Sequence, residues 1–102
     1  MLMEKYGVKP SLILFTDKLL KLLGCRHKIE IKTGSVVMIF YRGIIFKKEL
    51  VKISQTEKLV GIDIYLDNLS ESQASKISHL VSHLESLLKK RDVQLVFNKI
   101  II

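Results

Sequence analysis

The chain has 102 residues, 48% hydrophobic and 26% charged, which predicts one folded domain over residues 1–102 and excludes a disordered segment. The longest apolar runs, such as Val36–Tyr41, fall far short of the ~20 residues that span a bilayer. No secretory signal opens the chain, and the lone Cys25 cannot form an internal disulfide. We therefore expect a soluble, intracellular protein with no membrane partner.

The net charge of +7 is unevenly distributed. Residues 1–60 carry twelve Lys or Arg against five Asp or Glu, whereas residues 61–102 carry five of each. The excess positive charge therefore belongs to the first part of the chain, where it predicts a basic surface rather than a particular fold.

A first helix is predicted from Ser11 to Leu23, with Gly24 as its C-terminal stop. Its apolar stripe is wide, because Ile13 and Leu20 lie on the flanks and Leu14 points nearly opposite the stripe. The stripe itself consists of Leu12, Phe15, Leu19, Leu22 and Leu23. Helix one therefore has extra apolar surface to cover.

Four strands are predicted next. Lys28–Lys32 alternates, Thr33–Gly34 is a hairpin turn signal, and Ser35–Tyr41 is nearly all apolar, as expected for a central strand covered on both faces. After a tight turn at Arg42 and Gly43 we expect a third strand over Ile44–Val51 and a fourth over Val60–Leu66.

The longest helical pattern runs from Ser70 to about Lys90. Ser70 and Gln73 have the spacing of a capping box, and leucines recur at helical intervals behind them. The period then changes to the alternation of a strand over Val93–Phe97. This strand–helix–strand unit should cross over right-handed if its strands share a sheet.

The two helix–strand units align with each other at an offset of 65 residues, with Leu12 on Ile77 and Leu19 on Leu84. A shared helix-to-strand junction favours an internal duplication, with motif one at about 1–50, motif two at about 51–102, and a groove between them. The alternative interpretation is chance similarity between two core helices.

These elements predict an α+β domain of two layers, with two helices on one face of a mostly antiparallel sheet and the two motifs related by a pseudo-two-fold axis. Residues 1–9 fit either a short strand or a frayed arm. If residues 2–8 form a strand, a ferredoxin-like variant becomes the closest alternative. Leu12–Phe15 also fits a strand, with a shorter helix capped at Thr16.

Residues with catalytic or metal-binding chemistry are sparse. His79 and His83 are one helical turn apart, but the segment lacks a metalloprotease glutamate and an obvious third ligand. Cys25 and His27 have no identifiable orienting acid, and the glycines are scattered singly rather than in a phosphate-binding loop. We expect no enzyme, no metal and no cofactor.

A protein–protein interaction module is the leading hypothesis, with a partner peptide or helix bound in the groove between the motifs. It rests on the wide apolar belt of helix one and on the isoleucine tail, which alternatively completes an internal strand or forms a self-association edge, as in a homodimer. The candidate residues are Ile13, Leu14, Lys18, Leu20, Lys21, Ile100, Ile101 and Ile102.

The alternative is nucleic-acid binding by a basic face within residues 26–52, where aromatic residues lie between lysines. Its candidate residues are Lys28, Lys32, Tyr41, Arg42, Phe46, Lys47, Lys48 and Lys52. Fourteen lysines against three arginines favour ordinary lysine decoration of strands, because readers of bases and phosphates prefer arginine.

In length, in its Lys, Ile and Leu content, in having Ala74 as the only alanine, and in its closing Asn98–Ile102 segment, the chain resembles the small proteins of Acidianus filamentous viruses. These are lipothrixviruses of hyperthermophilic archaea. The resemblance implies a non-enzymatic viral protein in the host cytoplasm or the virion, a high working temperature, and a viral or host protein as partner. It is global, carried by no motif, and supplies no site residues.

Overall fold

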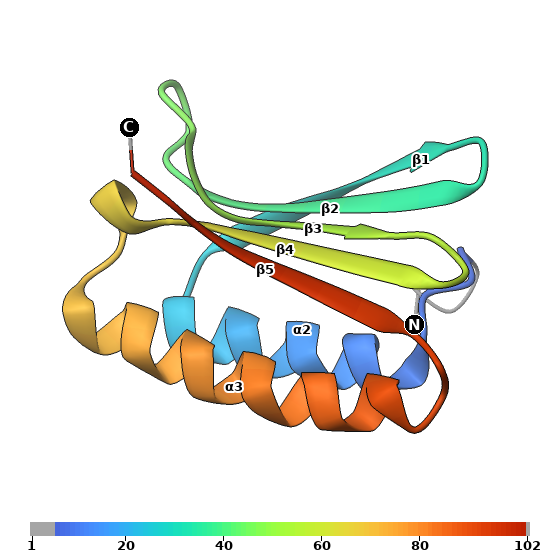
Figure 1. Ribbon diagram of the computed structural model, residues 1–102. Helices are drawn as coiled ribbons and strands as arrows, with labels where there is room; N and C mark the ends of the chain where they lie inside the picture. Colours follow the sequence, from blue (N-terminus) through green and yellow to red (C-terminus); the bar gives the residue numbers. More distant parts are fainter. Residues whose placement is uncertain (1–5, 102) are drawn as a thin grey trace.

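The structure is a computed structural model that describes residues 6–101. The chain forms a helix, four strands, a short 3₁₀ turn, a second helix and a last strand (Figure 1). Named as in Figure 1, these are α2 (Pro10–Leu23), β1 (Arg26–Lys32), β2 (Ser35–Arg42), β3 (Lys48–Gln55), β4 (Leu59–Tyr65), η1 (Leu66–Asn68), α3 (Glu71–Lys89) and β5 (Gln94–Ile100).

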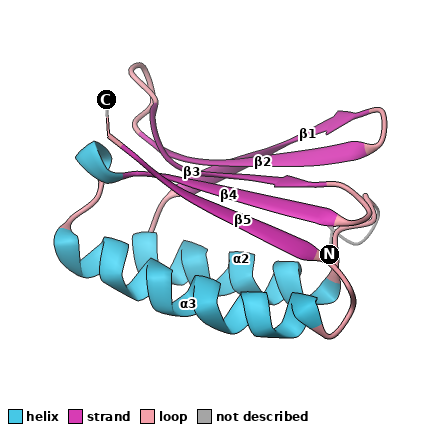
Figure 2. Ribbon diagram, viewed as in Figure 1, coloured by secondary structure: helices cyan, strands magenta, loops and turns pink. Residues whose placement is uncertain are grey.

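The five strands form one sheet in chain order, β1-β2-β3-β4-β5. The first three pairs are antiparallel and the last is parallel, because α3 carries the chain back before β5 begins. Both helices lie against the same face of the sheet (Figure 2). The predicted α+β class and two-layer arrangement are therefore confirmed.

One hydrophobic core fills the space between the layers. Alternate residues of the inner strands point into it, including Met38 and Phe40 of β2 and Ile53 of β3, all fully buried. The helices contribute the predicted stripes: Leu12, Phe15, Leu19 and Leu23 from α2, and Ile77, Val81, Leu84 and Leu88 from α3. Each fully buried side chain of this size stabilises the fold by about 1.5–3 kcal/mol.

The helix ends follow the sequence signals. Ser70 Oγ accepts a hydrogen bond from Gln73 N–H (3.1 Å), and Gln73 Oε1 accepts one from Ser70 N–H (3.0 Å), so the capping box is confirmed. Gly24 ends α2 in the left-handed region at φ 55°. The Arg42 guanidinium donates to the Leu23 carbonyl oxygen (2.8 Å), which satisfies an otherwise free carbonyl at that end.

The N-terminal segment is held to the sheet by the Gln55 side chain, in addition to Val8, which is buried in the core. Gln55 Oε1 accepts from Lys9 N–H (2.9 Å), and Gln55 Nε2 donates to the Gly7 carbonyl oxygen (3.0 Å). Residues 6–9 form a turn followed by coil, and α2 is helical throughout 12–15, so the strand alternative there is wrong. Of the strand considered for residues 2–8, the part at 2–5 lies outside the described residues.

The third strand was predicted over Ile44–Val51, but it begins at Lys48 and runs to Gln55. The register explains the error: Phe40 pairs with Val51 and Met38 with Ile53, which puts all four side chains in the core. With Arg42 paired to Lys48, residues 43–47 have no partner row and form the connecting loop.

The internal duplication is not confirmed. β1 and β5 occupy opposite edges of the sheet and run in opposite directions, as a two-fold axis through β3 requires. However, β2 and β4 both run antiparallel to β3 and therefore share one direction, which that axis does not allow. The duplication stays a prediction for the outer helix–strand units and does not describe the inner strands.

Candidate interaction surfaces

The residues considered for chemistry are His79 and His83 on α3, and Cys25 and His27 near the start of β1. In the described residues 6–101, no group of three or more His, Cys, Asp and Glu side chains is placed to hold a metal ion. His79 and His83 are exposed on α3. His27 stacks on Phe40 at 5.9 Å between ring centroids, and burial raises the pKa of the Cys25 thiol against the opposing effect of Arg42, so this thiol is poorly ionised at neutral pH.

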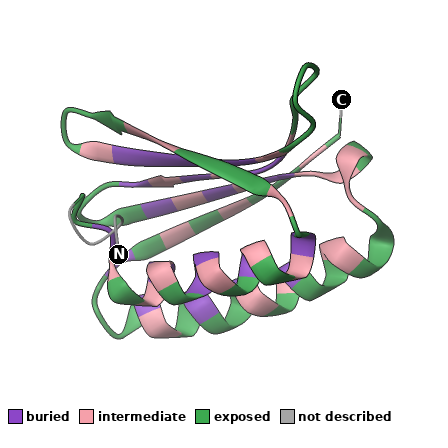
Figure 3. Cartoon of the chain, turned by 180° about the vertical axis from the view of Figure 1, so that it is seen from behind, coloured by how far each residue is buried: buried purple, intermediate pink, exposed green. Residues whose placement is uncertain are grey.

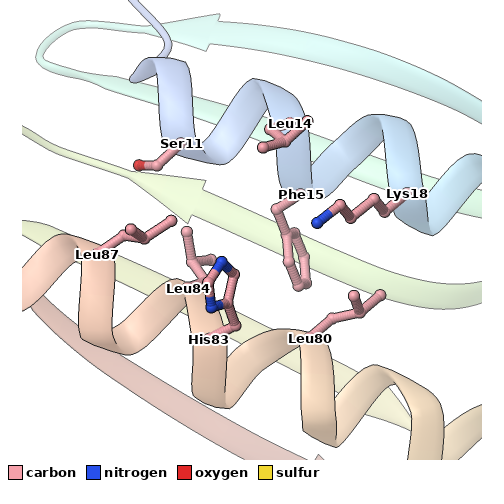
Figure 4. A pocket seen from close by; sticks show the side chains of 8 residues that line it. All are labelled: Ser11, Leu14, Phe15, Lys18, Leu80, His83, Leu84 and Leu87. Atoms are coloured by element: carbon pink, nitrogen blue, oxygen red, sulfur yellow. The ribbon is translucent and has the colours of Figure 1, made fainter.

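A seam between α2 and α3 opens on the side of the helices that faces away from the sheet (Figure 4). Leu14 is its most exposed apolar residue on α2, at 50% exposure, and Phe15 points from α2 toward α3 beneath it. The lining residues are Ser11, Leu14, Phe15, Lys18, Leu80, His83, Leu84 and Leu87. Each helix thus presents residues at spacings of three and four, which lie on one face of a helix.

The seam is shallow. Its free volume is about 10 Å³, which is about the space of one water molecule. It is therefore a groove between two rows of side chains rather than a cavity for a small ligand. Lys18 and His83 are the basic side chains that lie beside its leucines.

Only two of the eight predicted partner-binding residues, Leu14 and Lys18, lie in the seam. Ile13 and Leu20 are partly buried and pack against the core, which removes much of the extra apolar surface expected on α2. Lys21 is exposed outside the seam. Ile100 ends β5 and Ile101 follows it, both at the far end of the sheet, and Ile102 lies outside the described residues.

The predicted basic face is divided between the two faces of the sheet. Lys28 and Lys52 flank Ile39 on the face away from the helices, but Asp63 lies beside Lys52 and Glu30 pairs with Lys28 at 3.5 Å. Lys32 is exposed near the other end of β1. Arg42 points to the helix layer, where it binds the end of α2.

The loop between β2 and β3 forms an exposed apolar surface where the sequence predicted the start of a strand. Ile44, Ile45 and Phe46 are 72%, 85% and 85% exposed, although they were predicted to begin the third strand, Ile44–Val51. The loop projects beyond the sheet in Figure 1 and is exposed throughout in Figure 3. Lys47 Nζ lies 5.1 Å from the centroid of the Tyr41 ring, a cation–π distance that holds the loop base to the sheet.

A larger hollow of about 660 Å³ lies at the opposite end, where α2 begins and α3 ends. Lys58, Lys90 and Arg91 line it, and the Lys9 ammonium donates to the Glu57 carbonyl oxygen there (2.9 Å). Its rim includes Gly7 of the N-terminal turn.

The chain matches no protein-family model, no curated protein and no solved structure. Within residues 6–101, no helix has the length and apolarity needed to cross a membrane. The candidate interaction surfaces are the α2–α3 seam, the divided basic face and the β2–β3 loop.

Proposed function

We propose that this chain is a non-enzymatic protein-interaction module whose α2–α3 seam binds an acidic amphipathic helix of a partner protein. The observation that carries the proposal is Leu14, a large apolar side chain that stays half exposed above a groove lined by leucines of the other helix. Water contact with this surface is unfavourable, and an apolar partner removes it.

The seam fits a helix better than an extended peptide. The long axis of the groove follows two antiparallel helices, whose facing rows repeat at three and four residues (Figure 4). A third helix can place its own i, i+3, i+4 and i+7 side chains between those rows. An added strand would instead need free backbone groups, which helices do not offer.

The charge of the rim selects an acidic partner. The Lys18 ammonium lies beside the apolar groove, and Lys21 follows one turn later on the same helix. A partner with glutamates flanking its leucine stripe gains favourable pairing at both positions, whereas a basic partner meets repulsion. Polar charges at the rim mainly set the association rate and its salt dependence.

The test uses a model helical peptide with a leucine stripe flanked by glutamates, titrated into isotope-labelled protein by NMR. We expect amide shifts to cluster at Leu14, Lys18, Leu80 and Leu87, and Leu14→Glu to lower the affinity at least about tenfold. Leu59→Glu is the matched control, because Leu59 is 40% exposed and lies away from the seam on β4. No binding, or equal binding by Leu14→Glu, overturns the proposal.

Nucleic-acid binding through residues 26–52 is the second candidate, and the Lys47–Tyr41 contact at the base of the β2–β3 loop is the observation in its favour. Its test is binding of labelled single- and double-stranded DNA at about 50 and about 200 mM salt. Several lysine–phosphate contacts predict a steep loss of affinity with salt, and absence of binding at the lower salt removes this candidate.

A further inference from the structure

We propose that the β2–β3 loop is a membrane-surface anchor that inserts Ile44, Ile45 and Phe46 among the headgroups of anionic lipids. This inference goes beyond the proposed function, because the loop lies at the end of the sheet and not in the α2–α3 seam. It also differs from the sequence-based expectation of no membrane partner, which considered only segments that span a bilayer.

The loop concentrates more exposed apolar surface than any other run within residues 6–101. It carries three consecutive large side chains, each more than 70% exposed, and Ile101 at 74% exposure lies at the same end of the sheet. Isolated exposed apolar residues are normal, but a contiguous apolar cluster marks a binding surface.

The loop is shaped by its sequence rather than left loose. Gly43 has φ 99°, a conformation that favours glycine, and a β-carbon there would collide with the Phe46 carbonyl oxygen. Lys47 is held over the Tyr41 ring at the base of the loop. A fixed turn presents the apolar side chains without a large entropy loss on binding.

The end of the sheet from which the loop projects carries an excess of basic charge. At this end of the sheet and its connections, five basic side chains stand against the two carboxylates Glu49 and Asp67, a balance of +3. The five are Arg26, Arg42, Lys47, Lys48 and Lys99. Anionic headgroups attract such a cluster, and long lysine side chains reach the headgroup level while apolar neighbours go deeper.

This combination favours a lipid surface over a protein partner. The loop is a convex projection (Figure 1), whereas protein interfaces require a complementary surface and are depleted in lysine. An apolar tip with a lysine-rich rim is the pattern of segments that lie in the membrane interface. Insertion is shallow, because the backbone of the loop must stay near water.

The experiment exploits the absence of tryptophan from the chain. Phe46→Trp places a single tryptophan at the tip, and its emission is recorded with vesicles of phosphatidylcholine alone or mixed with phosphatidylglycerol. We expect a blue shift and quenching by brominated lipids only with the anionic vesicles, weakened by salt. Leu59→Trp, at the opposite end of β4, is the matched reporter and should show neither change.

Co-sedimentation with the anionic vesicles measures how much the apolar tip and the lysines each contribute to binding. Ile45→Ser and Phe46→Ser should each weaken binding about tenfold, and Lys47→Gln with Lys48→Gln should weaken it while circular dichroism stays unchanged. Equal binding by the serine variants overturns the proposal. The proposal is also overturned if the emission of Phe46→Trp changes with a DNA oligonucleotide or with the acidic helical peptide but not with vesicles. That result would assign the loop to another partner.

Discussion

Gln55 is expected to be one of the most important polar side chains for stability, because its amide holds two backbone groups of the segment that enters α2. The side chain is only 6% exposed and makes two hydrogen bonds, to Lys9 N–H and to the Gly7 carbonyl oxygen. Lys9 is the N-cap of α2 and provides no side-chain cap of its own. Replacing Gln55 by Met keeps the side-chain length but removes both bonds.

The cost follows from what the substitution leaves behind. Each bond contributes about 0.5–1.5 kcal/mol, and here two partly buried backbone groups lose their partner, so Gln55→Met should cost about 1–3 kcal/mol. For a domain of this size, about 2 kcal/mol lowers Tm by roughly 10 °C. The protection of the Lys9 amide against hydrogen exchange should fall as well.

Urea denaturation followed by circular dichroism measures the change, with an unchanged m-value as the sign that the unfolded state is unaffected. Gln94→Met is the matched control, because Gln94 is exposed on β5 and should change the stability by less than about 0.5 kcal/mol. A loss below about 0.5 kcal/mol for Gln55→Met, with the Lys9 amide still protected, refutes the reasoning.

Two further outcomes are expected. Ser70→Ala removes the acceptor of the Gln73 N–H bond and should destabilise the fold by about 1 kcal/mol in urea, whereas Ser72→Ala in the same exposed turn should stay within about 0.5 kcal/mol. Burial raises the pKa of the Cys25 thiol, so at mildly alkaline pH alkylation should be slower than that of a free cysteine peptide. Unfolding in urea should restore the ordinary alkylation rate. If the folded protein is alkylated as fast as the free cysteine peptide, the raised pKa of Cys25 is wrong.

Most of the architecture was predictable because local signals and burial agree. The Ser70 capping box and the leucine period predict a helix, and the alternation of Val60–Tyr65 predicts a strand. The structure has α3 and β4 at these places. The β2–β3 loop was not predictable in the same way. Apolar residues at Ile44–Phe46 satisfy a strand pattern, and only the register of β2 with β3 shows that no strand or helix covers them.

For the candidate surfaces too, local sequence signals predicted some positions, whereas tertiary packing decided the others. The helical angle of Leu14 predicted a residue outside the core stripe, and its 50% exposure agrees with that position. The same angles placed Ile13 and Leu20 on the flanks, but their contact with the core depends on how close the sheet approaches, which helical periodicity does not specify. The separation of Ile100 and Ile101 from the seam likewise follows from β5 pairing with β4.

The excess positive charge of the first sixty residues includes lysines beside both proposed binding surfaces. The seam rim at Lys18 and the loop base at Lys47 and Lys48 both belong to the first sixty residues, which hold the whole excess of +7. The seam opens from the helix layer, and the loop projects from the end of the sheet, so the acidic helix and the anionic surface that we propose as partners would bind different parts of the molecule. A basic domain between two acidic partners can bring them together, and because Leu14 and Phe46 do not share a surface, each binding proposal fails or stands without the other.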